Sequence, residues 1–280
     1  MISFLEHCGT NFFSLMSGFA QDSSRVFWSA LVWGRVDPSC RDKAEISRLF
    51  FGLGMIHVLV LSGSQVGSFM RIHDLVLGLF LKVFRLSRSS ALAYVGVVLS
   101  WASLAVYVAA TGASAPLVRA FIVLAVSECG VVKGVLSKIA LSFVLHVVLF
   151  PQHSGTLSFV LSWGAFLLLV MLSEFGIPRF VGLAVLCISC QLLVIIVKGP
   201  SATASLGWKG LFANLALVPL FEGIVFPLGS LIASFVIACS SLGVSWDESG
   251  SWRQIFDYGL VLHDILAQVF LGALKGIRYI

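Results

Sequence analysis

The stretch IALSFVLHVVLFPQHSGTLSFVLSWGAFLLLVMLS, residues 139–173, decides the fold because it contains no Asp, Glu, Lys or Arg. Two apolar runs, 135–150 and 157–173, flank the short polar turn 151–156. Charged side chains are the costliest groups to place in hydrocarbon, so a long charge-free stretch indicates helices that cross a bilayer. The sequence therefore predicts a hairpin of membrane helices here.

The rest of the chain is similarly apolar. Of its 280 residues, 59% are hydrophobic and 11% are charged, whereas a soluble domain carries about 25% charged residues. The mean hydropathy of +1.02 excludes an ordinary soluble protein, and the ample apolar surface excludes a disordered one. At about 20 residues per crossing, the length suits one all-α membrane bundle of about seven or eight segments, some of them broken or short. The predicted segments are 50–70, 72–86, 91–110, 115–132, 135–150, 157–173, 180–197 and 211–240.

Charged residues mark both ends of the chain. Residues 1–48 include its most charged part and are predicted to form an interfacial or soluble preamble to a membrane domain at 49–245. Residues 246–280 are predicted to form an amphipathic helix, whose polar residues fall within about 80° of one another on a helical wheel. This helix either lies in the membrane interface or crosses the membrane with its polar stripe against water. The stripe consists of Arg253, Asp257, Asp264, Gln268, Lys275 and Arg278.

Basic loops predict the orientation. Lys and Arg are enriched in cytoplasmic loops, and basic clusters at 82–88 and 133–138 flank a hairpin whose tip, 111–116, carries no charge. We therefore place both clusters in the cytoplasm and the turn 151–156 outside.

Two charges interrupt the segment 115–132, namely Arg119 and Glu128. Each charge at the centre of a membrane helix costs about 2.5–3.5 kcal/mol, and each Leu, Ile, Val or Phe returns only about 0.3–0.6 kcal/mol. This segment therefore needs protein neighbours or a watery cavity. Arg119 either serves a function there or extends from the helix end toward phosphate headgroups.

The apolar run that contains His57 is interrupted at Ser62, Gly63, Ser64 and Gln65. Either the helix continues, with His57 and Ser64 on one face, or it breaks at Ser62 and Gly63 and exposes backbone groups toward a pathway. Both versions place polar groups inward. The alternative is that His57 and Gln65 only form hydrogen bonds between helices.

Motifs for catalysis and metal binding are weak. Cys187 and Cys190 match C-x-x-C in the middle of an apolar run, without a second pair, so we expect them to serve packing. The chain contains no P-loop, no metal-ligand spacing among its six histidines and no nucleophile elbow. We therefore expect no enzymatic activity and no cofactor, with energy supplied by a partner.

Several stretches resemble the transmembrane competence domain of the ComEC family. YVAATGASAPLVRA at 107–120 is similar to the family's Y-x-x-x-x-G-x-S-x-S/P-x-x-R-A, and it matches at Gly112, Ser114, Arg119 and Ala120. HVLVLSG at 57–63 is similar to H-L-L-A-I-S-G-L-H-V, with Gln65 at the position of the family's second His.

Further partial matches follow in the family's order. Gln191 corresponds to the Gln of A-Q-L-A-T-L-P, and Asn214 begins NLALVPL, which is similar to N-L-L-A-V-P-L. FPLG at 226–229 is similar to L-P-L-G, LSF at 157–159 resembles the end of G-F-Q-L-S-F, and ALVWG at 30–34 also takes part in the resemblance.

The resemblance implies a multi-pass protein of the bacterial inner membrane that carries single-stranded DNA into the cytoplasm during natural transformation. Arg119 would contact phosphate, and the rest of the path would be formed by His57, Ser62, Gly63, Gln65, Ser114, Gln191 and Asn214. The implied partners are the lipid bilayer, single-stranded DNA, a DNA-delivery protein and a cytoplasmic helicase or translocase.

Family members usually add an OB-like domain and a metallo-β-lactamase-like domain. About 48 residues before the first predicted segment are too few for an OB-like domain, and we expect neither added domain in this chain. We therefore assign no strand degradation to it and count a separate nuclease among the expected partners. Two other functions remain open on the same bundle. One is a small-solute or ion transporter, and the other is a membrane scaffold that transports nothing.

Overall fold

A computed structural model describes residues 22–33, 43–52, 63–85, 91–178, 181–182, 184–189, 192, 208–241 and 264–276. These residues form helices and connecting turns, without a strand among them, which agrees with the all-α prediction. The helices are α2 (Asp22–Trp28), η1 (Ser29–Trp33), α3 (Lys43–Gly52), α5 (Gly63–Val83), α6 (Ala91–Ala110), α7 (Ala115–Cys129), α8 (Val135–Leu149), η2 (Pro151–His153), α9 (Leu157–Glu174), α11 (Trp208–Leu220), η4 (Phe221–Val225) and α12 (Phe226–Ser241). A further helix covers 264–276.

The two helices predicted at 135–150 and 157–173 and the turn between them are confirmed, whereas their crossing of a membrane stays a prediction. The helices α8 and α9 are joined by the 3-10 turn η2, and α9 begins where Thr156 accepts a hydrogen bond from the amide of Phe159. α6 covers the predicted segment 91–110, and α7 lies within 115–132.

The predicted division between segments 50–70 and 72–86 is wrong, because α5 runs without a break from Gly63 to Val83. Arg71 and Asp74 lie in the middle of this helix, and a prediction based on charge-free stretches ends a segment at such residues. The helix continues because its backbone hydrogen bonds are internal, and the charged side chains of Arg71 and Asp74, which are exposed, do not interrupt them.

The predicted segment 211–240 is one helical path with a change of geometry. α11 leads through the π-helix η4 into α12, with Pro219 inside α11 and Pro227 at the start of α12. A proline has no N–H group to donate to the carbonyl group four residues earlier, so it removes one hydrogen bond of the α-helix. A π-helical turn between two α-helical stretches lets the helix continue past such a missing bond. Residues 208–241 thus form a continuous helix with a π segment.

Among the residues that the structure describes, three helical stretches are long and apolar enough to cross a membrane: α6, α9 and Ala213–Ile232. α8 is apolar but shorter. The total number of crossings stays a prediction.

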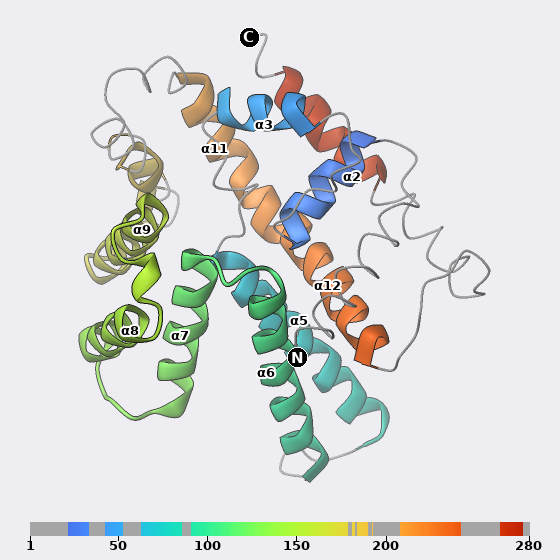
Figure 1. Cartoon of the computed structure of the whole chain (residues 1–280), viewed down its shortest axis with the longest axis vertical. Coiled ribbons are helices and arrows are strands. Elements are labelled where there is room, and N and C mark those ends of the chain that lie inside the picture. The colour runs from blue at the N-terminus through green and yellow to red at the C-terminus, as the bar shows by residue number, and fades with distance from the viewer. Residues whose placement is uncertain are drawn as a thin grey trace, which may run out of the picture.

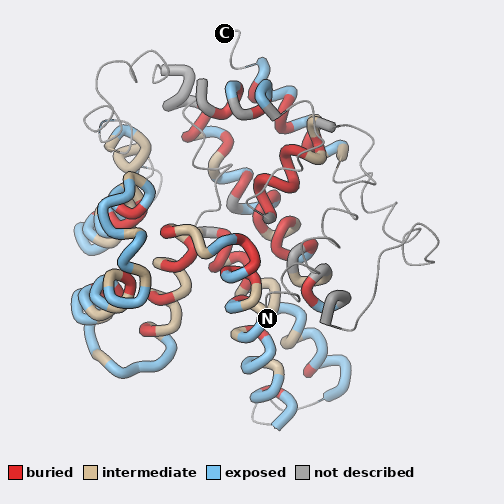
Figure 2. Tube along the Cα trace, viewed as in Figure 1, coloured by how far each residue is buried: buried red, intermediate tan, exposed pale blue. Residues whose placement is uncertain are grey.

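The centre of the bundle is α5, which packs against α6, α7 and α12, while α7 also packs against α8 and α9 (Figure 1). Figure 2 shows buried residues gathered where these helices meet, and exposed ones along the outer sides of α6, α8 and α9. Many exposed side chains there are apolar, including Leu99, Phe143 and Leu167. Large apolar surfaces of this kind suit contact with lipid.

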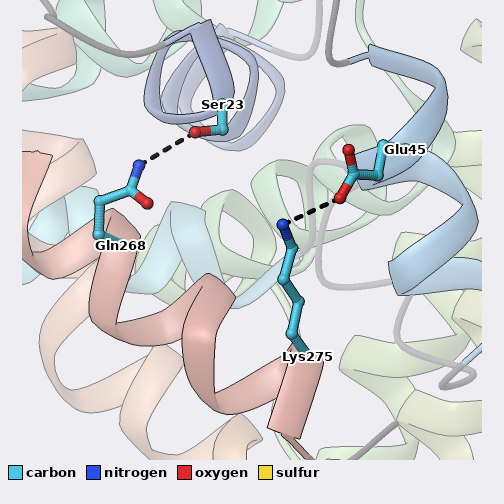
Figure 3. Close-up of polar contacts among 4 residues, drawn as sticks. All are labelled: Ser23, Glu45, Gln268 and Lys275. Carbon is cyan, nitrogen blue, oxygen red and sulfur yellow. Dashed lines mark hydrogen bonds and ion pairs between the residues drawn. The ribbon is translucent and has the colours of Figure 1, made fainter. Parts of the chain in front are cut away.

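The two ends of the described chain lie together. α2 and η1 are buried in the core, with Phe27 and Trp28 fully enclosed. In the helix at 264–276, Gln268 donates a 3.0 Å hydrogen bond to Ser23, and Lys275 pairs with Glu45 of α3 (Figure 3). Gln268 also donates a 2.9 Å hydrogen bond to Ser24. Gln268 and Lys275, two residues of the predicted polar stripe, thus contact protein. The domain boundaries at 48 and 245 stay predictions.

Candidate functional site

Arg119 lies in the second turn of α7, just after a tight connection from α6. Gly112 and Ala113 both have positive φ, at 83° and 48°. A left-handed backbone costs glycine little, which explains Gly112, and it allows α7 to turn back beside α6. Pro116 then occupies the first turn of α7, where its missing amide leaves no helical hydrogen bond unmade.

The guanidinium of Arg119 docks on α9. Its Nη1 donates a hydrogen bond to the carbonyl oxygen of Ser162 at 2.5 Å, and its Cζ lies 5.0 Å from the centroid of the Phe166 ring. Ser162 and Phe166 are one helical turn apart and therefore lie on the same face of α9. Arg119 thus contacts a neighbouring helix instead of extending toward headgroups.

Part of the hydrogen-bonding capacity at this point is unused. Arginine has five N–H donors, and the Nε of Arg119 is buried without a partner among the residues that the structure describes. The hydroxyl oxygens of Ser162 and Ser114 are also buried and unpartnered within this part of the chain. Ser114 stands at the N-cap of α7, but its side chain makes no capping bond.

Gly63, the first residue of α5, lies directly against Arg119. A Cβ atom built on Gly63 would be 2.5 Å from Nη2 of Arg119, 3.2 Å from Cβ of Ala120 and 3.4 Å from the carbonyl oxygen of Pro116. A side chain at this position would displace the guanidinium. The structure therefore brings together two of the predicted site residues, Gly63 and Arg119, which are 56 positions apart in the sequence.

Gln65 has a structural partner. It is buried, and its Nε2 donates a 2.6 Å hydrogen bond to the carbonyl oxygen of Leu31 in η1. Tyr107 makes the equivalent contact from α6, because its hydroxyl donates to the carbonyl oxygen of Val32 at 2.9 Å. Both acceptors lie near the end of a π-helix, where carbonyl groups lack partners within the helix. Gln65 is thus a hydrogen-bonder between helices, one of the two roles that the sequence left open.

Gly229 completes the surroundings of η1. Its hypothetical Cβ would be 3.0 Å from Cγ2 of Val32, so the absence of a side chain lets α12 approach η1 closely. The stretches 30–34, 107–120 and 226–229 therefore meet at η1, and all three belong to the set that carries the resemblance.

The other predicted site residues fall in different places. Asn214 is buried in α11, whereas His57, Ser62 and Gln191 lie outside the described residues. Within the described part of the chain, no three His, Cys, Asp or Glu side chains form a group that could hold a metal ion.

Sequence reasoning missed Ser162 and Phe166, which hold Arg119, and Tyr107, which holds η1. A signal for Ser162 exists: it is a hydroxyl residue within the apolar stretch 157–173, on the same helical face as an aromatic ring. The choice of Arg119 as its partner depends on how α7 and α9 pack, and the sequence pattern contains no information on that.

The arrangement provides a partly buried cation between three helices. A guanidinium with unused N–H donors binds phosphate or carboxylate oxygens well, because its planar donors match their geometry. The chemistry available at this site is therefore anion recognition.

A family model described as "Competence protein" matches residues 43–260. Comparisons with curated proteins and with solved structures found no match. The matched range contains all of the predicted site residues.

Proposed function

Since the chain belongs to the competence protein family, we propose that it forms the inner-membrane path by which a single DNA strand reaches the bacterial cytoplasm. The family supports a role in DNA uptake, and the apolar helices support a membrane location. The finer assignment of a multi-pass channel in the inner membrane is the proposal.

The observation that carries this proposal is the contact between Gly63 and Arg119. These two residues belong to the two stretches that most resemble the family, and they meet where α5, α7 and α9 come together. A helix can begin without a glycine, but only a residue without a side chain leaves room for the guanidinium at position 63. In this proposal the stretches 57–63 and 107–120 act together to position the guanidinium of Arg119 inside the bundle.

A cation in this place suits a polyanionic cargo. DNA carries a negative charge on every phosphate, and proteins bind its backbone chiefly through Arg and Lys. A charged strand also meets a large barrier in hydrocarbon, which dispersed positive charge along a watery route lowers. In this proposal the Nη–H donors of Arg119 that are not bound to Ser162 engage passing phosphates, while the buried Nε takes no part.

The chain works with partners in this proposal. A DNA-delivery protein supplies the strand from outside, a helicase or translocase draws it into the cytoplasm, and a separate nuclease degrades the other strand. We assign no enzymatic activity to the chain itself.

The test is replacement of Arg119 in cells at unchanged protein level. R119A removes the cation, and R119Q keeps an amide donor for Ser162 without the charge, whereas R119K keeps the charge without the planar donor set. A hydrogen bond to a charged group contributes about 1.5–3 kcal/mol, so we expect R119A and R119Q to lower transformation by about tenfold or more. R119K should retain more activity than R119Q.

Fluorescent DNA locates the defect. DNA should bind the envelope of R119A cells normally and fail to reach the cytoplasm. Normal cytoplasmic delivery in R119A cells would remove Arg119 from the mechanism, and normal delivery in cells without the gene would overturn the proposed function in favour of solute transport.

A further inference from the structure

Three side chains form a continuous hydrogen-bonded chain across the α8–α9 hairpin. Trp163 of α9 donates from Nε1 to Nδ1 of His146 at 3.1 Å. Nε2 of His146 in turn lies 3.0 Å from Nδ1 of His153 in η2. His146 is fully buried, and His153 sits in the turn with its ring stacked on Phe150. Neither histidine belongs to the stretches discussed above as the candidate site.

The direction of these hydrogen bonds follows from the tryptophan. An indole N–H only donates, so Nδ1 of His146 accepts and carries no proton. A neutral His146 therefore has its proton on Nε2 and donates it to Nδ1 of His153. Both rings are neutral in this arrangement, and Nδ1 of His153 is an acceptor.

We propose that Trp163, His146 and His153 form a proton-operated latch that holds the turn between α8 and α9. A proton added to Nδ1 of His153 would place an N–H against the N–H of His146 and break their bond. The alternative proton position, Nδ1 of His146, would break the bond to Trp163 instead. The latch is thus closed when both histidines are neutral, and it is released when one of them is protonated.

The latch is tied to the start of α9. The carbonyl oxygen of His153 accepts a 2.8 Å hydrogen bond from the hydroxyl of Thr156, and the same hydroxyl caps α9 by accepting from the amide of Phe159. Release of the His153 ring therefore loosens the cap of a helix that also carries Ser162, the residue that holds Arg119. In the predicted topology this turn lies outside the cytoplasm, so the latch senses the pH on that side.

The surroundings favour the neutral state. Burial lowers the pKa of His153 below its ordinary value of 6.5. Within the described residues, the titratable and charged groups that face the pair are the two histidines themselves and Arg119 of α7. α9 presents Phe159 and Trp163, which carry no charge.

The direction of the pH effect follows by linkage. The released turn takes up a proton more readily than the closed turn, because the pKa of His153 is lowered only in the closed state. The latch is therefore complete above about pH 6.5, weakens as the pH falls below this value, and changes no further once the pH is below the closed-state pKa. This inference does not depend on the cargo of the proposed path.

Hydrogen exchange on the full chain in lipid nanodiscs tests the latch without DNA. The reporters are the amides of Ser154 and Thr156, which donate within the turn to Pro151 and His153. We expect their protection, corrected for the intrinsic pH dependence of exchange, to fall by about tenfold or more between about pH 7.5 and about pH 5, which bracket the ordinary pKa of histidine.

Two variants separate titration from packing. In H153Q the amide oxygen still accepts from His146 but does not titrate, so protection should stay high at both pH values. In H153A the acceptor is gone, so protection should be low at both. Loss of protection in H153Q equal to that in the wild-type chain would overturn the proposal, and so would an H153A variant with wild-type protection at about pH 7.5.

Discussion

Arg119 is held by contacts that leave it available to a second partner. One of its nitrogen atoms donates to a backbone carbonyl and its plane lies over a ring, but neither contact neutralises its charge. A cation–π contact contributes about 0.5–2 kcal/mol and leaves the positive charge in place. The position of the guanidinium is therefore fixed, while its charge remains free to act on an anion.

The lack of a side chain at Gly63 leaves space for the guanidinium of Arg119. Adding a single methyl group there should therefore displace it. G63A would place Cβ at 2.5 Å from Nη2 of Arg119 and force the guanidinium to move. We expect transformation to fall by about tenfold, because misplacing a reacting or binding group by about 1 Å has effects of this size or larger. The measurement is transformation frequency at equal protein level in the membrane.

Gly67 provides the matched control for this substitution. It lies one turn later in α5, and a Cβ there would be 3.7 Å from Nη2 of Arg71, an ordinary contact. Gly67 lies inside α5 and Gly63 at its first position, so G67A shows what an added methyl group on this helix does where it meets only an ordinary contact. A lower transformation frequency in G63A than in G67A therefore reports on the crowded contact of α5 with Arg119 and its neighbours on α7. Equal transformation in the two variants would contradict a positional role for Gly63.

At the scale of elements, η1 is held in place by donors from two other helices. Tyr107 is buried, and its hydroxyl supplies the hydrogen bond that the carbonyl of Val32 lacks within η1. Y107F would leave this buried carbonyl without that donor, which costs about 1–3 kcal/mol. We expect a lower unfolding temperature in detergent for Y107F.

The control for Y107F lies on the same helix. Tyr94 is 73% exposed on α6, so Y94F removes an identical hydroxyl from a side chain that is not buried in the bundle. Its unfolding temperature should match that of the wild-type chain. A Y107F variant as stable as Y94F would show that the bond to Val32 contributes nothing to stability.

The helices were more predictable than their contacts. The segment 91–110 coincides with α6 because Ala91 and Ala110 bound an uninterrupted apolar run. The division of α5 at Arg71 failed because a charged side chain does not interrupt the backbone hydrogen bonds within a helix, so the helix runs through Arg71 from Gly63 to Val83. The hydrogen bond from Gln65 to Leu31 joins positions 34 apart, and no local pattern specifies such an acceptor.

At the scale of the whole molecule, the flanks of the family match pack on each other. The match covers 43–260, whereas α2, η1 and the helix at 264–276 lie outside it and still contribute buried residues such as Trp28, Phe270 and Leu274 to the core. Phe270 also contacts Phe221 of η4, with ring centroids 5.0 Å apart. The ends therefore belong to the same bundle as the matched region.

The helix at 264–276 makes two kinds of polar contact with the amino-terminal helices, a buried hydrogen-bonded one through Gln268 and an exposed ion pair through Lys275. We expect substitutions at these two residues to affect stability differently. Gln268 donates to Ser23 and to the fully buried Ser24, so Q268A leaves two hydroxyl groups without this donor and should destabilise the chain by about 1–3 kcal/mol. Lys275 and Glu45 are 53% and 60% exposed although their charged atoms are 2.9 Å apart, and exposed pairs contribute only about 0–1 kcal/mol. K275A should therefore leave the unfolding temperature in detergent nearly unchanged, while Q268A lowers it. If K275A destabilised the chain as much as Q268A, the exposed ion pair and not the buried amide would be what joins the two ends.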